Sequence, residues 1–155
     1  AKQRPLHQPL LVLVASQGDV WNYARGIDDR ATALMDAFWP GKLTIVLEAR
    51  SILPMGLTGG TGRIGIRLAG HPVCRRIVQD LPGPLTATSA NLSGHPGCHR
   101  VEDLHSDIAA AADFILDAGP LQAGIGSTVV DIRPAKVHIL REGAVAALDI
   151  LNAVA

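Results

Sequence analysis

The sequence is poor in aromatic residues, cysteine and net charge, and each shortage excludes a class of protein. Aromatic residues make up 3% of the 155 positions and apolar residues 48%, so the core must be aliphatic. The formal net charge of zero argues against broad electrostatic capture of nucleic acid, although it leaves room for a local basic pocket. Two cysteines, Cys74 and Cys98, are too few for the disulfide framework of a secreted domain. We therefore expect a cytoplasmic protein.

Long apolar runs are also missing. No run approaches the roughly 18 residues that a membrane-spanning helix needs, and the stretch from Leu10 to Ala15 has the length of a buried strand. A membrane is therefore not an expected partner. The first residues carry neither a signal peptide nor an initiator methionine, so we expect the chain to start partway through a longer one.

The hydrophobic pattern predicts strands and helices without strict alternation of the two. Strands are expected at residues 10–14, 43–48, 63–68, 85–88, 114–117, 127–132 and 136–140. Helices are expected at residues 30–39, 71–81, 106–114 and 144–154. The fold class is therefore α/β with an α+β-like order, a twisted mixed parallel and antiparallel sheet flanked by helices. No linker or repeat divides the chain, so residues 1–155 are expected to form a single domain.

Two cations stand just before the first predicted strand. Lys2 and Arg4 are two positions apart, and Pro5 favours an extended backbone at Arg4, so both side chains point to the same side. Such a pair suits a polyphosphate or a carboxylate, because arginine can hold two oxygens at once. The alternative is a pair of solvated charges near a terminus.

The stretch at residues 84–94 (PLTATSANLSG) is the most informative one in the chain. A short apolar strand runs into small hydroxyl and amide residues, among them Thr88, Ser89 and Asn91. Donors at the end of a strand are typical of ligand sites in open α/β sheets. A turn whose side chains bond their own backbone explains the same composition equally well.

Five motifs together resemble the YrdC-like family, which includes the TsaC-type threonylcarbamoyl-AMP synthases. They occur in the family's order and approximate spacing: KQRP at 2–5, FWPG at 38–41, PLTATSANLSG at 84–94, GSTVVD at 126–131 and ILREG at 139–143. The resemblance implies the family's reaction, in which ATP, L-threonine and bicarbonate give threonylcarbamoyl-adenylate and pyrophosphate. It implies a nucleotidyltransferase acting in t6A modification of tRNA, with the partner proteins of that pathway.

The resemblance also implies the site residues. The family's catalytic and nucleotide-binding tetrad corresponds to Lys2, Arg4, Ser89 and Asn91. Thr88, Ser127 and Arg141 match further nucleotide-binding positions, and Arg67 matches the arginine that lies near the threonine substrate. Magnesium is expected to arrive with ATP, held by phosphates and water, because no dedicated protein ligands for a metal are visible.

One family motif has no counterpart here. The family normally carries an upstream P-T-D/E-T-x-Y-G-L segment that lines the threonine pocket, and nothing of that form occurs in the sequence. The domain is therefore expected to lack the family's first strands. Nucleotide binding is expected to survive this loss better than threonine recognition and synthesis, so the activity of the chain itself stays open. Exposed sheet edge and core surface are expected as well.

Two further patterns are set aside. Residues 60–65 (GTGRIG) match G-x-G-x-x-G, but they lead into a strand rather than a helix, which excludes a dinucleotide-binding turn. His95, His99 and Cys98 lack the paired spacing of a structural zinc site, so exposed loop residues are expected there. Cys74 falls on the apolar side of a predicted helix and is interpreted as a buried thiol.

Two alternative functions remain. The first keeps the adenylate and changes the acceptor, as in the carbamoyl-adenylate-forming domain of hydrogenase-maturation carbamoyltransferases. The second is a YrdC-like module that binds RNA without catalysis, through a local patch formed by Lys2, Arg4, Arg63, Arg67 and Arg141. Zero net charge weakens the second alternative.

Overall fold

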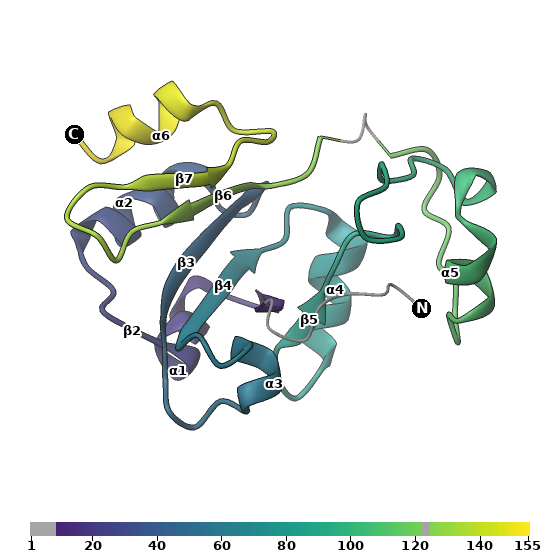
Figure 1. Cartoon of the computed structure of the whole chain (residues 1–155), viewed down its shortest axis with the longest axis horizontal. Coiled ribbons are helices and arrows are strands. Elements are labelled where there is room, and N and C mark those ends of the chain that lie inside the picture. Colours follow the sequence, from purple (N-terminus) through teal and green to yellow (C-terminus); the bar gives the residue numbers. More distant parts are fainter. Residues whose placement is uncertain (1–8, 122–124) are drawn as a thin grey trace.

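The computed structural model of the chain describes residues 9–121 and 125–155 (Figure 1). Their strands are β1 (Leu11–Val14), β2 (Ala24–Arg25), β3 (Leu43–Ala49), β4 (Arg63–Leu68), β5 (Leu85–Ala87), β6 (Thr128–Asp131) and β7 (His138–Arg141). The helices are α1 (Val20–Tyr23), α2 (Asp29–Phe38), α3 (Met55–Thr58), α4 (Pro72–Asp80), α5 (Ser106–Ala110) and α6 (Ala147–Ala153). Two short 3₁₀ turns, η1 (Gln17–Asp19) and η2 (Val101–Asp103), complete the described elements.

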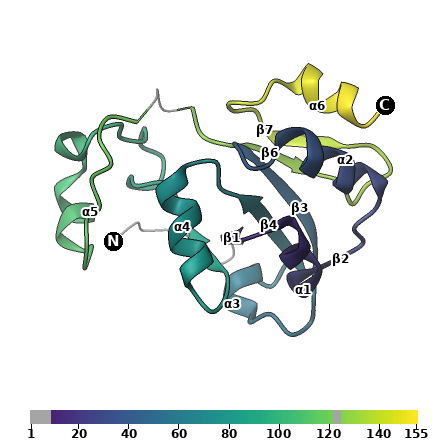
Figure 2. The ribbon, with the colours of Figure 1, turned by 180° about the vertical axis from the view of Figure 1, so that it is seen from behind.

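The strands form one mixed sheet in the order β5-β1-β4-β3-β6-β7, and β2 pairs with β3 beside this path. β1 runs parallel to β4, and β3 runs parallel to β6. The other neighbours are antiparallel. Helices flank the sheet, as Figures 1 and 2 show. The mixed sheet flanked by helices that the sequence predicts is therefore confirmed.

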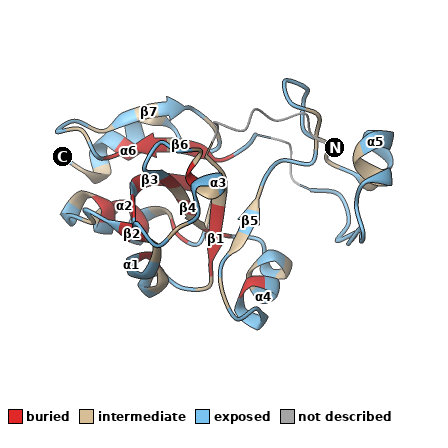
Figure 3. Cartoon of the chain, turned by 60° about the horizontal axis from the view of Figure 1, so that its bottom comes forward, coloured by how far each residue is buried: buried red, intermediate tan, exposed pale blue. Residues whose placement is uncertain are grey.

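One face of the sheet carries the main hydrophobic core. Every second residue of a strand points to the same face, and this face receives the apolar side chains of β1, β3, β4 and β6. Leu34 and Met35 of α2 and Ile150 of α6 pack against it, and all three are buried. Figure 3 shows the buried residues gathered in these strands and helices. Aliphatic residues dominate this core, as the low aromatic content predicts.

The opposite face is covered in part by α4. Leu13, Ala69 and Val78 form a second, smaller buried cluster there, with Leu85 and Ala87 packed against it. α4 therefore lies over the β1–β5 side of this face. The β3–β6 side of the same face carries the polar side chains described below.

Local signals explain where α2 begins and ends. The Asp28 side chain accepts a hydrogen bond from the Ala31 N–H, which caps the first turn, and Pro40 follows the last residue of the helix by two positions. Arg30 then ties α2 to the turn between β6 and β7. Its guanidinium donates to the backbone carbonyls of Ile132, Pro134 and Ala135.

Most predicted elements are present, but between residues 70 and 120 two predictions are wrong and one helix is shorter than predicted. Residues 114–117 form no strand, and Phe114 is 94% exposed, because no neighbouring described strand offers the run a pairing partner. The helix predicted at 106–114 ends at Ala110, where the last apolar side chains find no surface to pack on. Cys74 is exposed rather than buried, since Val78 is the buried residue of α4.

Candidate functional site

The predicted site residues fall into three groups. Lys2 and Arg4 lie outside the described residues. Thr88, Ser89 and Asn91 lie in the loop after β5. The third group comprises Arg67 of β4, Ser127 just before β6 and Arg141 at the end of β7.

The third group converges on one face of the sheet. Val46 pairs with Gly65 and Thr44 pairs with Val129, so Thr44, Gly65 and Val129 share a face. Arg67 follows Gly65 by two positions and Ser127 precedes Val129 by two, which places both on that face. Arg141 joins them because it pairs with Val129 across the β6–β7 ladder. The sheet thus brings these three predicted site residues to one face, and their role in binding stays a prediction.

Hydrogen bonds connect Arg141 to Ser127, and Ser127 to the neighbouring Thr44. Arg141 donates from Nη2 to the Ser127 backbone carbonyl at 2.7 Å and to Ser127 Oγ at 3.2 Å, and its Nε lies 3.2 Å from the same carbonyl. Ser127 Oγ also lies 2.9 Å from Thr44 Oγ1. We call Thr44, Arg67, Ser127 and Arg141 the sheet-face cluster.

A close backbone approach holds Arg141 against Ser127. A Cβ on Gly143 would lie 2.4 Å from the Gly126 carbonyl oxygen and 2.7 Å from the Thr128 nitrogen, so only glycine fits here. The Thr128 hydroxyl accepts from the N–H groups of Gly143 and Val145 and donates to the Val145 carbonyl. These hydrogen bonds join the GSTVVD and ILREG motifs into one unit, the Thr128-centred unit. This unit orients the Arg141 guanidinium.

Arg67 has a buried donor that the described residues leave unused. Its Nε is buried and has no hydrogen-bond partner among the described residues. Burial lowers the pKa of Arg67 below its ordinary value; Cys74 acts in the opposite direction, and the nearby Arg141 guanidinium adds to the lowering. An arginine stays charged despite such a shift, so this face carries two close positive charges. That arrangement favours an anionic ligand, whose oxygens would satisfy the guanidinium.

The Thr88–Asn91 loop lies at a different place along the sheet. Thr88 and Ser89 are exposed, and the Asn91 side-chain amide donates to the His95 carbonyl. β5 is separated from β4 by β1, and from β6 by β1, β4 and β3. At about 4.8 Å per strand, the loop's strand lies roughly 10 Å from the strand of Arg67 and roughly 19 Å from the strand of Ser127. A ligand that touches both groups must therefore be elongated.

The chain enters β1 at the same end of the sheet where β5 leaves it. Leu11 pairs with Ala87 in an antiparallel register, so residues just before Leu11 and just after Ala87 start from one edge. Lys2 and Arg4 precede this point along the chain. That topology is compatible with the predicted tetrad, and the contact between its two halves stays a prediction.

Sequence reasoning missed two polar residues of this region, Thr44 and Thr128. Both are buried, and both use their hydroxyl groups inside the site's framework. A hydroxyl within an otherwise aliphatic strand such as LTIVL is the signal that could have drawn attention to Thr44, because a buried hydroxyl needs a partner.

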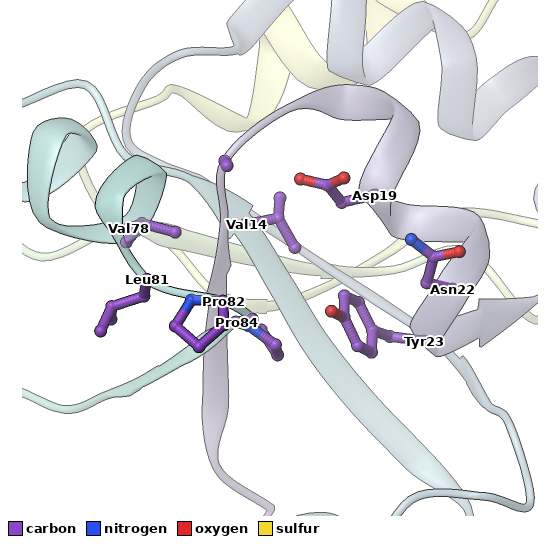
Figure 4. A pocket seen from close by; sticks show the side chains of 10 residues that line it. Val14, Asp19, Asn22, Tyr23, Val78, Leu81, Pro82 and Pro84 are labelled. Atoms are coloured by element: carbon purple, nitrogen blue, oxygen red, sulfur yellow. The ribbon is translucent and has the colours of Figure 1, made fainter.

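A separate cavity of about 260 Å³ lies at the other end of the β1–β5 pair. Val14, Val78, Leu81 and the Pro82–Pro84 turn form its apolar wall, opposite Asp19, Asn22 and Tyr23 (Figure 4). Within residues 9–121 and 125–155, no predicted site residue lines it, and the one charged side chain of its wall, Asp19, is a carboxylate. The cavity therefore does not suit a polyphosphate.

Two features are absent from residues 9–121 and 125–155. Within them, no group of three histidine, cysteine or acidic side chains is arranged to hold a metal ion. Within the same ranges, no helix has both the length and the apolar character required to cross a bilayer.

Comparisons with known proteins agree with the motifs. The Sua5/YciO/YrdC family model, described as telomere recombination, matches residues 1–143. The chain is 31% identical to a threonylcarbamoyl-AMP synthase of Pyrococcus abyssi over 143 residues, which cover 92% of this chain and 42% of that protein. It is 32% identical to the threonylcarbamoyl-AMP synthase of Bacillus subtilis over 146 residues, which cover 94% of this chain and 42% of that protein.

The fold agrees as well. The crystal structure of P. abyssi Sua5 complexed with L-threonine matches with a TM-score of 0.93 at 30% identity, over 99% of this chain and 45% of that chain. The chain thus spans less than half the length of each of these matched chains. Because the family model covers nearly the whole sequence, this chain belongs to the Sua5/YciO/YrdC family.

Proposed function

We propose that this chain carries the substrate-binding and catalytic domain of an ATP-dependent threonylcarbamoyl-adenylate synthase, a nucleotidyltransferase. The observation that carries the proposal is the sheet-face cluster, in which the buried Nε of Arg67 finds no partner in the described part of the chain and Arg141 is fixed on Ser127. The names of the relatives support the same activity, as does the L-threonine bound by P. abyssi Sua5.

The proposed reaction requires little covalent help from the protein. The threonine amine combines with bicarbonate to give a carbamate and water. A carbamate oxygen then forms a bond to the α-phosphorus of ATP, and the bond from that phosphorus to the pyrophosphate oxygen breaks. Orientation of the reactants and neutralisation of phosphate charge dominate such a reaction. Fixed guanidinium groups and hydroxyl donors supply both.

In this proposal each group of residues contacts a different part of an elongated ligand. Arg67 binds the threonine carboxylate, and Ser127 and Arg141 contact the nucleotide. Lys2, Arg4, Ser89 and Asn91 act on the phosphates, and Thr88 assists at the same loop. The separation of roughly 10–19 Å between the strands that carry these groups supports an adenylate joined to an amino acid rather than a small anion.

Magnesium enters the proposal as part of the nucleotide substrate. Two carboxylates share the face of the cluster, and each is already engaged: Glu48 with Arg25, and Asp131 with Arg133. These carboxylates therefore do not fit a resident metal. An ion held by phosphate oxygens and water does fit.

The product places the protein in t6A modification of tRNA, with the partner proteins of that pathway and a cytoplasmic setting, as the sequence predicts. The carbamoyltransferase alternative shares the adenylate step and differs in the acceptor. The RNA-binding alternative requires no binding of ATP.

Equilibrium binding measured by calorimetry tests the proposal. The wild-type chain should bind a nonhydrolysable ATP analogue and L-threonine. Arg67→Gln should weaken threonine binding at least tenfold, and Arg141→Gln should weaken the ATP analogue similarly, because each removes a charged donor. Arg76→Gln is the matched control: Arg76 is an exposed arginine of α4 paired with Asp80, and its replacement should leave both affinities unchanged.

Pyrophosphate release that requires both threonine and bicarbonate would establish the synthase. Release with carbamoyl donors instead of threonine would favour the carbamoyltransferase alternative. Salt-sensitive binding of tRNA without any binding of the ATP analogue would replace the proposal with the RNA-binding module. If the Arg67 and Arg141 variants both kept wild-type affinities for L-threonine and the ATP analogue, the sheet-face cluster would not be part of the binding site.

A further inference from the structure

Thr44 is a buried hydroxyl that none of the predicted site assignments uses. It lies within β3 and is 4% exposed. Its methyl group faces Gly65, where an added Cβ would lie 3.2 Å away, so the absence of a side chain at Gly65 makes room for it. With the methyl group directed toward β4, the hydroxyl is directed toward Ser127, 2.9 Å away. The packing thus fixes the rotamer of Thr44.

The direction of the Thr44–Ser127 hydrogen bond follows from the other partners. Distances alone allow either hydroxyl to donate. Each hydroxyl has one proton and two lone pairs, whereas the Arg141 guanidinium has donors only. Arg141 donates to Ser127 Oγ and so occupies one of its lone pairs. The second lone pair of Ser127 Oγ is available to the Thr44 proton.

The opposite direction is less favourable. If Ser127 donated to Thr44, the buried Thr44 hydroxyl would need another acceptor for its own proton, and a buried donor without a partner is unfavourable. Both hydroxyls are buried, with Thr44 4% and Ser127 5% exposed, but Ser127 lies in the loop before β6 beside Arg141, whereas Thr44 lies within a strand between β4 and β6. The Ser127 proton is therefore the one that lies next to the guanidinium to which the proposed function assigns a ligand contact.

We propose that Thr44 is a positioning residue that turns the Ser127 hydroxyl into a committed donor for an anionic oxygen of the ligand, a carboxylate or a phosphate. Thr44 and Arg141 fill both lone pairs of Ser127 Oγ, and accepting two hydrogen bonds strengthens the Ser127 O–H as a donor. Arg67, on the same face, supplies the charge. The inference rests on the proposed function for the identity of the ligand.

The cluster therefore selects for acceptors. A carboxylate or phosphate oxygen accepts from Ser127 and from a guanidinium, whereas an amine in the same place would meet donors only. Thr44 touches no ligand itself in this arrangement. Its effect passes entirely through Ser127, which gives the inference a test that separates it from a packing role.

The test is a double-mutant cycle on ligand affinity. Thr44→Val keeps the shape of the side chain and removes the hydroxyl, and Thr44→Ser keeps the hydroxyl. Calorimetric titrations with L-threonine, a nonhydrolysable ATP analogue and inorganic pyrophosphate are compared for both variants, Ser127→Ala and the double variant. Thr86→Val, at an exposed position of β5, is the matched control.

Thr44→Val should weaken one ligand about tenfold, and Thr44→Ser should remain within about twofold of wild type. Loss of threonine affinity assigns the contact to the carboxylate; loss of ATP-analogue or pyrophosphate affinity assigns it to a phosphate. In the Ser127→Ala background, Thr44→Val should have no further effect on that ligand, because its only route is through the missing hydroxyl.

Other outcomes overturn the inference. Wild-type affinity for all three ligands in Thr44→Val, or effects of the two substitutions that simply add, would reduce Thr44 to a packing residue while the proposed function stands. Binding of pyrophosphate alone by the wild type would reject the proposed function, and the cycle on pyrophosphate would still decide the role of Thr44. Failure of the wild type to bind any of the three would reject both.

Discussion

Two regions of this molecule are built in opposite ways. Strands β3, β4, β6 and β7 hold the sheet-face cluster in a framework of buried side chains and backbone hydrogen bonds. Residues 88–121, after β5, are largely exposed, and their regular structure is limited to η2 and α5. Figures 1 and 3 show this segment beside the sheet, beyond β5, with its residues mostly exposed.

The difference indicates how the work of the site is divided. Arg141 and Ser127 are oriented before any ligand arrives, so little conformational entropy is lost when they bind one. Ser89 and Asn91 lie on a loop whose position depends on fewer buried contacts. In the proposed function, the framework supplies fixed charge and the loop adapts to the ligand. Substitutions should therefore have unequal effects in the two regions.

The largest expected contrast concerns two leucines. Leu43 of β3 is 0% exposed, and its replacement by alanine should lower the free energy of unfolding by about 2–5 kcal/mol. Leu116 is 67% exposed, and the same change there should cost less than about 0.5 kcal/mol. Urea unfolding followed by circular dichroism measures both. Equal losses would show that residues 88–121 pack against a surface in solution and would break the comparison.

The accuracy of the sequence predictions follows the same division. Strands such as residues 43–48 and 63–68 were predictable because their aliphatic runs are buried and their ends are marked by glycine or proline. The run at residues 114–117 has the same composition but no neighbour to pair with, and composition alone cannot reveal that. Whether such a run becomes a strand depends on a neighbouring strand with which it can pair and pack, rather than on its own strand propensity.

The site shows a similar limit. Arg67, Ser127 and Arg141 could be proposed from motifs, and the sheet brings them together. The role of Thr44 could not, because the Thr44–Ser127 bond depends on strand order and on the bare backbone at Gly65. Lys2 and Arg4 lie outside the described residues, so their place beside Ser89 and Asn91 stays a prediction, as does the single domain over residues 1–155.

Two glycines provide the second contrast. Gly143→Ala should destabilise the chain by about 1–3 kcal/mol, because the new methyl group would meet the backbone of Gly126 and Thr128. Gly97→Ala, in the exposed segment, meets no atom within 4 Å and should be neutral or slightly stabilising. Thermal and urea unfolding of both variants decide the matter. If Gly143→Ala left the free energy of unfolding unchanged, the Thr128-centred unit would be able to rearrange at little cost. That result would contradict a preoriented Arg141.

The smallest expected effect, on the order of 1 kcal/mol, concerns a buried carboxylate on the cluster's face. Burial of Asp131 opposes its ionisation, but hydrogen bonds from the side chain and backbone of Arg133 outweigh burial, and the pKa of Asp131 lies below its ordinary value. The ion pair therefore stabilises the fold at pH values above the unfolded-state pKa of about 3.9. This stabilisation is lost as the pH falls from there through the lower folded-state pKa.

Asp131→Asn tests that sign. The variant should be less stable than wild type at neutral pH, and the difference in unfolding free energy should shrink as the pH falls below about 4, because wild type then loses the same ionised group. Urea titrations of wild type and the variant between pH 7 and pH 2.5 measure this difference in unfolding free energy. The control is Asp107→Asn on the exposed helix α5, with an expected change below about 0.5 kcal/mol at neutral pH. A difference that grows on acidification would show that Asp131 destabilises the framework when ionised. The sheet-face cluster would then owe its rigidity to the Thr128 hydrogen bonds and the aliphatic core alone.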